Sequence, residues 1–288
     1  MGSILFTSWL TLSFKVIERW HINNLQAIVY NYTTCVITGS IVNRQFPINA
    51  SLIKEPWLPW ACLMGLTFIS LLNLVAFNSR KVGVAVTSVA FKISLVIPFV
   101  FSLYLYHEHA DVFKIAGIVL ALAAVILTCI PAKKEKDNNI PSNPILWIAP
   151  LALFAGSGLL DTMIKYVEQA FINNANQDAY LVTAFGSAAG SGLILLMILF
   201  ASGRLKFSWK AVWAGIAIGV PNYFSIWCLV RALKGYENNS SAIIPVNNMG
   251  IVLLSALVAW LFLHEKLSSA NWIGILLSLT AIALIAFG

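Results

Sequence analysis

The chain contains the stretch HEHADVFKIAGIVLALAAVIL at residues 107–127 and a counterpart, HEKLSSANWIGILLSLTAIAL, at residues 264–284. The two stretches lie 157 residues apart, and eight of their 21 positions are identical. Each begins with a His-Glu pair and continues into a mostly apolar run, of about the length that a helix needs to cross a bilayer. The repetition predicts a duplicated chain built from transmembrane helices.

The composition of the whole chain agrees with this prediction. Of its 288 residues, 59% are hydrophobic and only 10% are charged, and the mean hydropathy is +0.84. Soluble domains carry about 25% charged residues, so this composition argues against a soluble enzyme. We attribute the net charge of +7 to loops at a membrane surface and expect no nucleic-acid partner.

Ten apolar stretches between turn signals have the length and composition of transmembrane helices. Their expected bounds are residues 2–17, 24–42, 57–77, 84–106, 112–130, 145–167, 177–201, 209–233, 240–263 and 270–287. The segments between them are short, so we expect no separate soluble domain. The predicted fold is an all-α polytopic membrane protein with ten transmembrane helices.

The longest polar stretch, residues 131–144, divides the chain into two halves. Its charged run and its Pro-Ser-Asn-Pro end predict a solvated linker. Residues 1–130 and residues 145–288 then hold five spans each. Because five is odd, the second half crosses the bilayer in the opposite sense, and inverted repeats of this kind are typical of secondary transporters.

Several features of the two halves together match a known family. They are the ten spans in two sets of five, the His-Glu turns at 107–108 and 264–265 with the apolar runs that follow, and the Ala-Leu-Lys end of the eighth span at 232–234. With these features the chain resembles the EamA-type branch of the drug/metabolite transporter superfamily, although His107 and His264 stand where that family usually has glycine. The resemblance implies a central cavity surrounded by spans one to four and six to nine, with the fifth and tenth spans at the periphery. It carries almost no information about the substrate.

Lys92 is the clearest candidate for a substrate contact. It lies roughly eight residues, or about 12 Å, into the fourth span, which places its ammonium near the middle of the bilayer. An ionisable group there costs about 2.5–3.5 kcal/mol and is therefore kept for function or tightly paired. Ser88 lies one turn earlier on the same face. We predict that Lys92 binds a carboxylate, phosphate or other electron-rich group, with a paired or snorkelling structural lysine as the alternative.

Polar residues at similar depth in other spans complete the predicted substrate-binding set. They are Asn247, Asn248, Asn222, Tyr223, Asn31 and Tyr32. The 157-residue offset carries the surroundings of Lys92 onto the ninth span, and Pro221 and Pro245 predict local kinks that free carbonyl groups for a ligand. The alternative for each amide and tyrosine is a role in binding one membrane helix to another.

Asp161 is the deepest acid in the chain. It shares a helix face with Lys165 and Glu168, which follow at intervals of one turn. If protons drive transport, Asp161 is the candidate for proton coupling. The alternative, which we favour here, is a neutralised pair that orders the end of the sixth span, because Lys15 and Glu18 form a similar pattern 150 residues earlier.

No catalytic, metal or cofactor site is expected. His107, Glu108, His109 and Asp111 offer four metal-ligand types within five residues. Only the first two recur in the second copy, at His264 and Glu265, so acidic and small polar residues here are expected to cap the following helix. The sequence contains no nucleophile and base arrangement that suggests hydrolysis.

The sequence therefore predicts a secondary transporter of a small organic metabolite, such as an amino acid, in a bacterial inner membrane. Its partners would be this small molecule and the lipid bilayer, and a coupling proton and homo-oligomerisation are left open. Lys and Arg are more frequent after odd-numbered spans, which favours both termini outside, whereas the family resemblance implies both inside. The alternatives are an exchanger of phosphorylated or nucleotide-linked sugars, for which a second midplane cation is expected, and a non-transporting membrane scaffold.

Overall fold

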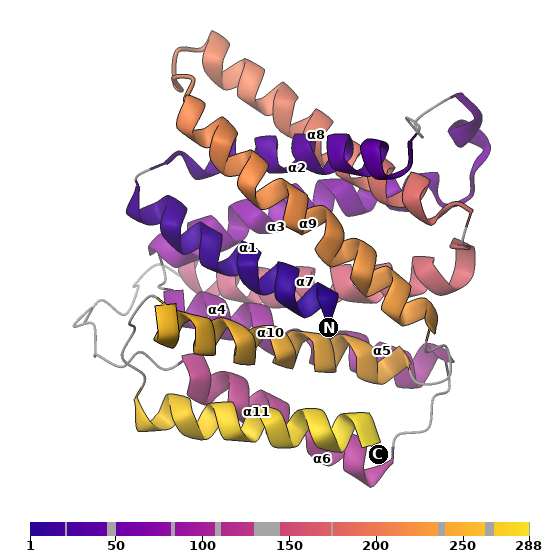
Figure 1. The fold of residues 1–288 in the computed structure, drawn as a ribbon, viewed down its shortest axis with the longest axis vertical. Coiled ribbons are helices and arrows are strands. Elements are labelled where there is room, and N and C mark those ends of the chain that lie inside the picture. The colour runs from indigo at the N-terminus through magenta and orange to yellow at the C-terminus, as the bar shows by residue number, and fades with distance from the viewer. Residues whose placement is uncertain are drawn as a thin grey trace. The chain divides into compact units, whose positions relative to one another are not determined.

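The computed structural model describes residues 1–287 except 21, 45–49, 82–83, 107–110, 130–144, 174, 236–239 and 263–267. Every regular element in the described ranges is a helix (Figure 1). The helices are α1 (Gly2–Arg19), α2 (Asn24–Val42), the short 3-10 helix η1 (Ala50–Lys54), α3 (Leu58–Lys81), α4 (Val84–Ile93), α5 (Val96–Tyr106), α6 (Val112–Cys129), α7 (Ile145–Phe171), α8 (Gln177–Ala201), α9 (Trp209–Gly235), α10 (Ser240–Phe262) and α11 (Ser269–Phe287). The prediction of an all-α protein is confirmed.

The helix bounds agree closely with the predicted spans. Helices α2 and α8 begin and end at the predicted residues, while α7 continues four residues further, to Phe171. Within the described residues, four segments are long and apolar enough to cross a membrane: Leu58–Val75, Ile148–Phe171, Gln177–Ala201 and Trp209–Gly235. Shorter apolar segments lie at Ala90–Tyr104, Val112–Leu127, Ile243–Val258 and Ser269–Ile285. The protein is thus a multi-pass membrane protein, while the count of ten spans and their inversion stay predictions.

One predicted span is wrong in its continuity, because the structure divides residues 84–106 into α4 and α5. The cause is Pro98, which has no N–H and whose ring would clash with the carbonyl of Ser94 in a continuous helix. Ile97 donates instead to the Ser94 carbonyl at 2.9 Å, and Leu95 donates to the Lys92 carbonyl at 3.3 Å. These tighter turns place the break directly after Lys92.

The two prolines that predicted kinks lie inside continuous helices, Pro221 in α9 and Pro245 in α10. Pro221 leaves the carbonyl of Ala217, one turn earlier, without its helical donor. The indole Nε1 of Trp9 donates to this carbonyl at 3.3 Å. The freed carbonyl of α9 is therefore occupied by α1 and is not left for a ligand.

The chain forms two compact units, each of which takes segments from both halves of the sequence. Unit 1 consists of Met1, Leu74–Thr162 and Ala232–Gly288, and unit 2 consists of Gly2–Asn73 and Met163–Arg231. Unit 1 thus combines α4, α5, α6 and most of α7 with α10 and α11. Unit 2 combines α1, α2 and most of α3 with the end of α7, α8 and most of α9.

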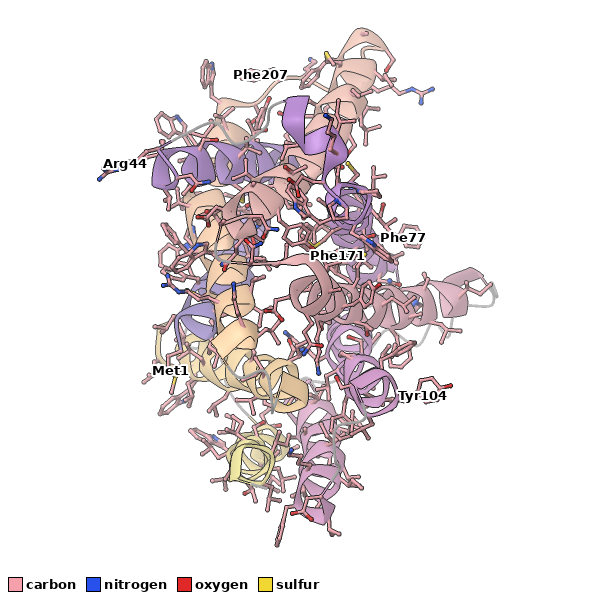
Figure 2. The ribbon with its side chains drawn as sticks, turned by 90° about the vertical axis from the view of Figure 1, so that its right-hand side faces the viewer. Met1, Arg44, Phe77, Tyr104, Phe171 and Phe207 are labelled. Carbon is pink, nitrogen blue, oxygen red and sulfur yellow. The ribbon has the colours of Figure 1, made fainter. Side chains whose placement is uncertain are left out.

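In unit 1, α6 and α11 lie side by side (Figure 1). These are the two copies of the repeated sequence, and they pack so closely that a Cβ atom added to Gly117 would lie 2.6 Å from Cγ1 of Ile285. The buried core beneath them also includes Leu95 of the break and Met249 of α10. Tyr104 of α5 projects from the ribbon and is 78% exposed, as expected of an aromatic residue on a membrane-facing surface (Figure 2).

Polar residues cap α6 and α11, as predicted from the sequence. The carboxylate Oδ1 of Asp111 accepts a hydrogen bond from the Val112 N–H at 2.7 Å. Ser268 and Asn271 cap α11 reciprocally, and Asn271 Nδ2 also donates to the Leu127 carbonyl of α6 at 3.1 Å. The two His-Glu pairs at 107–108 and 264–265 and His109 lie outside the described residues, and the described residues contain no group of metal-ligand side chains.

In unit 2, α2 and α8 lie side by side and small residues allow other helices to approach closely (Figure 1). A Cβ atom on Gly192 of α8 would lie 2.7 Å from Cγ2 of Val29. A Cβ atom on Gly219 of α9 would lie 2.6 Å from the Asn31 carbonyl oxygen. Helices α8 and α9 therefore contact α2 at positions where only glycine fits.

Candidate functional site

The polar cluster of unit 1 is built from Lys92, Asp161 and Asn248, which come from α4, α7 and α10. Asn248 Nδ2 donates to Asp161 Oδ2 at 3.4 Å. The positive charge of Lys92 acts electrostatically on the Asp161 carboxylate. All three side chains are partly buried, neither sealed in the core nor fully exposed.

The local structure around Lys92 suits a positive charge. Lys92 lies in the last turn of α4, where the helix dipole favours a cation. Its Nζ lies 5.2 Å from the centroid of the Phe91 ring, within the range of a cation–π contact. The helix break after Lys92 therefore positions an ammonium group at the end of a short helix.

The other residues predicted for this cluster are Asn247 and Ser88. Asn247 is partly buried on α10, next to Asn248. Met249, the following residue, is fully buried in the apolar core and fixes this part of α10. The side chain of Ser88 lies outside the described part of the structure. The cluster therefore consists of a cation, an anion and an amide, which together can bind opposite charges.

The polar cluster of unit 2 is neutral and sealed. Asn222 Nδ2 donates to Asn31 Oδ1 at 3.1 Å, and the Cys35 thiol donates to the Gly219 carbonyl at 3.3 Å. Asn31 and Tyr223 have no exposed surface. These contacts connect α2 to α9, which is the role of helix-binding amides in membranes.

Aromatic rings fill the space around these amides. Tyr32 stacks on Phe68 and Phe185 at centroid distances of 6.2 Å, and Tyr223 is tilted against Phe185 at the same distance. Asn31 Nδ2, Tyr223 Oη and Thr183 Oγ1 are buried without a hydrogen-bond partner among the described residues. The structure thus brings together Asn31, Tyr32, Asn222 and Tyr223 in unit 2, and Lys92, Asp161 and Asn248 in unit 1.

Asp161 differs from the two charged residues that follow it on α7. Lys165 and Glu168 are buried, at 1% and 3% exposure, and both have polar or electrostatic contacts. Burial of a contacted acid and base fits the structural role that the sequence suggested for the end of this helix. Asp161 is instead hydrogen-bonded by α10. The side chains of Lys15 and Glu18 lie outside the described part of the structure.

The sequence did not predict one further polar group, formed by Asp178, Trp227 and Arg231 in unit 2. The Trp227 indole Nε1 donates to Asp178 Oδ1 at 3.0 Å. The guanidinium carbon of Arg231 lies 4.8 Å from the centroid of the same indole ring. The one signal in the sequence is the four-residue spacing of Trp227 and Arg231, which places both on one face of α9.

Comparison with known proteins assigns this arrangement to a family. Residues 145–287, which run from the start of α7 to the end of α11, match the EamA-like transporter family. The chain belongs to that family. The EamA-like family is one of transporters and not of enzymes, and membership agrees with the apolar helices of a multi-pass membrane protein.

Individual relatives extend the similarity over the whole chain. An uncharacterized protein of Haemophilus influenzae is 24% identical over 285 residues, which cover 97% of this chain and 94% of the relative. A solved crystal structure has the same fold, with a TM-score of 0.72 and 14% identity over 99% of this chain and 94% of that one. An acyl-CoA–sterol O-acyltransferase of Arabidopsis thaliana is 26% identical over 193 residues, which cover 66% of this chain and 55% of that enzyme.

Proposed function

We propose that this EamA-like protein is a secondary transporter of a small organic metabolite, such as an amino acid, in a bacterial inner membrane. Transport would occur by alternating access, as two inverted halves, residues 1–130 and 145–288, move around a substrate site. The relative from Haemophilus influenzae supports a bacterial setting. The lipid bilayer and the small-molecule cargo are the proposed partners.

The observation that carries this proposal is the charged cluster beside the helix break of unit 1. Broken helices lie within membrane proteins where they line a cavity or bind a substrate, because their free backbone groups need polar partners. Here the break follows Lys92. Asp161 of α7 interacts electrostatically with Lys92 and accepts a hydrogen bond from Asn248 of α10. Placing a charged pair inside membrane helices costs free energy, so such a pair is usually kept because it has a function.

The composition of the two units supports the proposed inversion. Each unit combines several corresponding spans of the two halves, the fourth and fifth with the ninth and tenth, and the second and third with the seventh and eighth. The first and sixth spans depart from this pairing, because α1 lies in unit 2 and most of α7 lies in unit 1. The repeated sequences themselves pack together as α6 and α11. Such pairing is expected when two copies of one unit are related by an approximate two-fold axis.

An amino acid fits the cluster better than the alternative cargo, a phosphorylated or nucleotide-linked sugar. Asp161 would repel a phosphate that bound to Lys92, because both groups are negative. Lys165, in the sixth predicted span, is buried and has an interaction of its own. The cluster thus favours a cargo that carries both charges or few.

Transport into lipid vesicles tests the proposal. The purified protein is reconstituted, and uptake of a mixture of labelled amino acids is compared for the native chain, Lys92→Ala and Lys210→Ala. Lys210 is an exposed lysine of α9 and serves as the matched control. We expect Lys92→Ala to lose at least about 99% of uptake, from the loss of a charge-assisted contact, and Lys210→Ala to keep it. Full uptake by a folded Lys92→Ala protein would remove Lys92 from the site.

A further inference from the structure

We infer that the loop between α8 and α9 in unit 2, residues 202–208, is a binding site for the headgroups of anionic phospholipids. Arg204 and Lys206 bind the lipid phosphate, and the rings of Phe207 and Trp209 lie at the level of the headgroups. The inference goes beyond the proposed function, which needs the bilayer as a solvent for the helices and assigns no lipid site.

The position of this loop in the chain brings it to a membrane surface. Helices α8 and α9 are both long and apolar enough to cross a bilayer. The residues that join two successive spans must emerge where the hydrocarbon ends, because their backbone groups need polar partners. The loop therefore lies beside the headgroups of one leaflet.

The charge of the loop suits an anion. Arg204 and Lys206 are exposed, and neither forms an ion pair with another described residue. The sequence contains no Asp or Glu between Asp178, at the start of α8, and Glu237. The N-terminus of α9 follows the loop directly, and its helix dipole also favours a negative group. A lipid phosphate therefore meets positive partners here, with no carboxylate in the loop or in the adjoining helix ends.

The opposite end of unit 2 does not have this bias. Helix α2 begins at the loop and ends before Arg44, and α9 runs from the loop to Arg231. Acidic residues accompany these cations, Asp178 in the first turn of α8 and Glu55 before α3. Positive charge without acids is thus a property of the loop between α8 and α9, and Arg44 provides an exposed cation for comparison.

Aromatic rings lie beside the two basic residues. Phe207 and Trp209 are 52% and 68% exposed, and their rings meet edge to face at a centroid distance of 5.2 Å. Tyr30 of α2 contacts the Phe207 ring edge to face at 6.4 Å. Trp and Tyr are enriched where headgroups meet hydrocarbon, because their rings are apolar with a polar tip. The loop thus combines phosphate-binding side chains with rings that hold it at the depth of the phosphates.

The first part of the loop has a fixed backbone. Gly203 follows the end of α8 with a φ of +67°, a conformation that favours glycine. Its N–H donates to the Phe200 carbonyl at 3.0 Å, and the Arg204 N–H donates to the Leu199 carbonyl at 3.1 Å. This pair of bonds is the Schellman ending of a helix. It fixes the point from which the Arg204 side chain leaves the backbone.

The second part of the loop is held by Gln26 of α2, which is fully buried. Its Nε2 donates to the Lys206 carbonyl at 2.7 Å, and its Oε1 accepts a hydrogen bond from the Ser208 N–H at 3.0 Å. Gln26 therefore binds the backbone on both sides of Phe207 and is a positioning residue without charge. Because the loop is ordered before lipid binds, little conformational entropy is lost on binding.

Lipid binding by the purified full chain tests the inference. The probes are phosphatidylglycerol, which has an anionic headgroup, and phosphatidylcholine with identical acyl chains, which has no net charge. Native mass spectrometry of the protein in neutral detergent gives a dissociation constant for each lipid. We expect the native chain to bind phosphatidylglycerol about tenfold tighter, since each basic residue near an anionic lipid contributes to binding.

Paired variants locate the binding site. The double variant Arg204→Gln, Lys206→Gln should bind the two lipids within about twofold of each other, because both phosphate contacts are lost. Arg44→Gln removes an exposed cation at the other end of unit 2 and is the matched control, which should keep the native preference. If the double variant does not fold, each single variant should lower the preference about threefold or more.

Gln26→Ala distinguishes an ordered site from diffuse attraction. This change removes no charge, so a surface that attracts lipid through net charge alone would keep the native preference. We expect the preference to fall about threefold, because the freed loop must be ordered when lipid binds. If this variant does not fold, the comparison of the loop variants with Arg44→Gln still decides whether the lipid binds at the loop.

Four results would overturn the inference. They are equal binding of the two lipids by the native chain, a native preference in the double variant, an equal loss in Arg44→Gln, and a native preference in folded Gln26→Ala. Displacement of phosphatidylglycerol by millimolar inorganic phosphate would assign the loop to a free anion instead. Uptake by vesicles reports on the proposed function separately, so intact uptake by a chain without lipid preference would overturn the lipid site alone.

Discussion

Both units contain polar side chains inside apolar helices, but the two sets differ in charge and in burial. In unit 1, Lys92 and Asp161 carry formal charges and are partly exposed. In unit 2, Asn31 and Asn222 are neutral, hydrogen-bonded to each other and buried. Under the proposed function, charge and accessibility separate a polar residue that binds substrate from one that joins membrane helices.

The energies explain why the two arrangements differ. A hydrogen bond between membrane helices contributes on average about 0.6 kcal/mol, so an amide pair is easily kept for packing. A charged side chain in the same place costs about 2.5–3.5 kcal/mol, so packing alone does not account for it and a functional role is expected. On this comparison, changes in unit 2 should lower stability and changes in unit 1 should lower transport.

The largest expected effect on stability is that of Gly219→Ala in unit 2. The new Cβ atom would lie 2.6 Å from the Asn31 carbonyl oxygen, a backbone atom that cannot move aside without shifting α2. We expect a loss of about 2–3 kcal/mol in the free energy of unfolding, measured by denaturant titration in detergent.

Gly190→Ala is the control for this prediction. A Cβ atom there meets no atom within 4 Å, so the change should be neutral or stabilise the helix by up to about 1 kcal/mol. Equal losses for the two variants would show that the contact of α9 with α2 does not govern the stability of unit 2.

The next effect concerns the helix break of unit 1. Pro98→Ala restores the N–H that a continuous helix needs at Ser94, so α4 and α5 should join and Lys92 should shift. We expect transport to fall about tenfold, because small misplacements at a site are costly. Pro245→Ala lies in a helix that is already continuous, and it should keep transport within about twofold.

A smaller effect is expected at the amide pair. Asn31→Ala and Asn222→Ala should each destabilise the protein by about 1 kcal/mol, and the double variant should cost less than the two single changes together, since both remove one contact. Transport per folded molecule should stay the same. A loss of transport without a loss of stability would place these amides in the substrate site and break the comparison between the units.

The smallest effect is expected for Trp227→Phe. This change removes the hydrogen bond to Asp178 and keeps a ring beneath Arg231. We expect a loss of about 0.5–1 kcal/mol, measured as a lower unfolding midpoint. Trp213→Phe on the exposed face of the same helix should leave the midpoint unchanged, and a similar drop there would point to a general effect of losing an indole.

The sequence was sufficient for the helix positions, because apolar length and turn residues are local signals. The capping roles of Asp111 and Ser268 were local too and are confirmed. The break at Ser94 was missed, although Pro98 stood in the sequence, because residues 84–106 are so uniformly apolar that length alone suggested one span.

The candidate site was predictable in its members but not in its grouping. Lys92, Asp161 and Asn248 are each polar residues in apolar stretches of the sequence. The hydrogen bonds of Asn248 to Asp161 and of Asn222 to Asn31 depend on the packing of helices distant in sequence. Periodicity within one helix does not show which helices pack together. The contact between Asp178 and Trp227 was not predicted for the same reason.

The hydrogen bond from Trp9 to the Ala217 carbonyl lets α1 satisfy a backbone acceptor of α9. Proline leaves a gap in the backbone bonding of α9, and a residue 208 positions away closes it. Helix α1, which is synthesised before α9, thus completes the backbone bonding of the later helix. A nascent chain that stops before α9 leaves this indole without its acceptor, so this contact of α1 forms only after α9 has been synthesised.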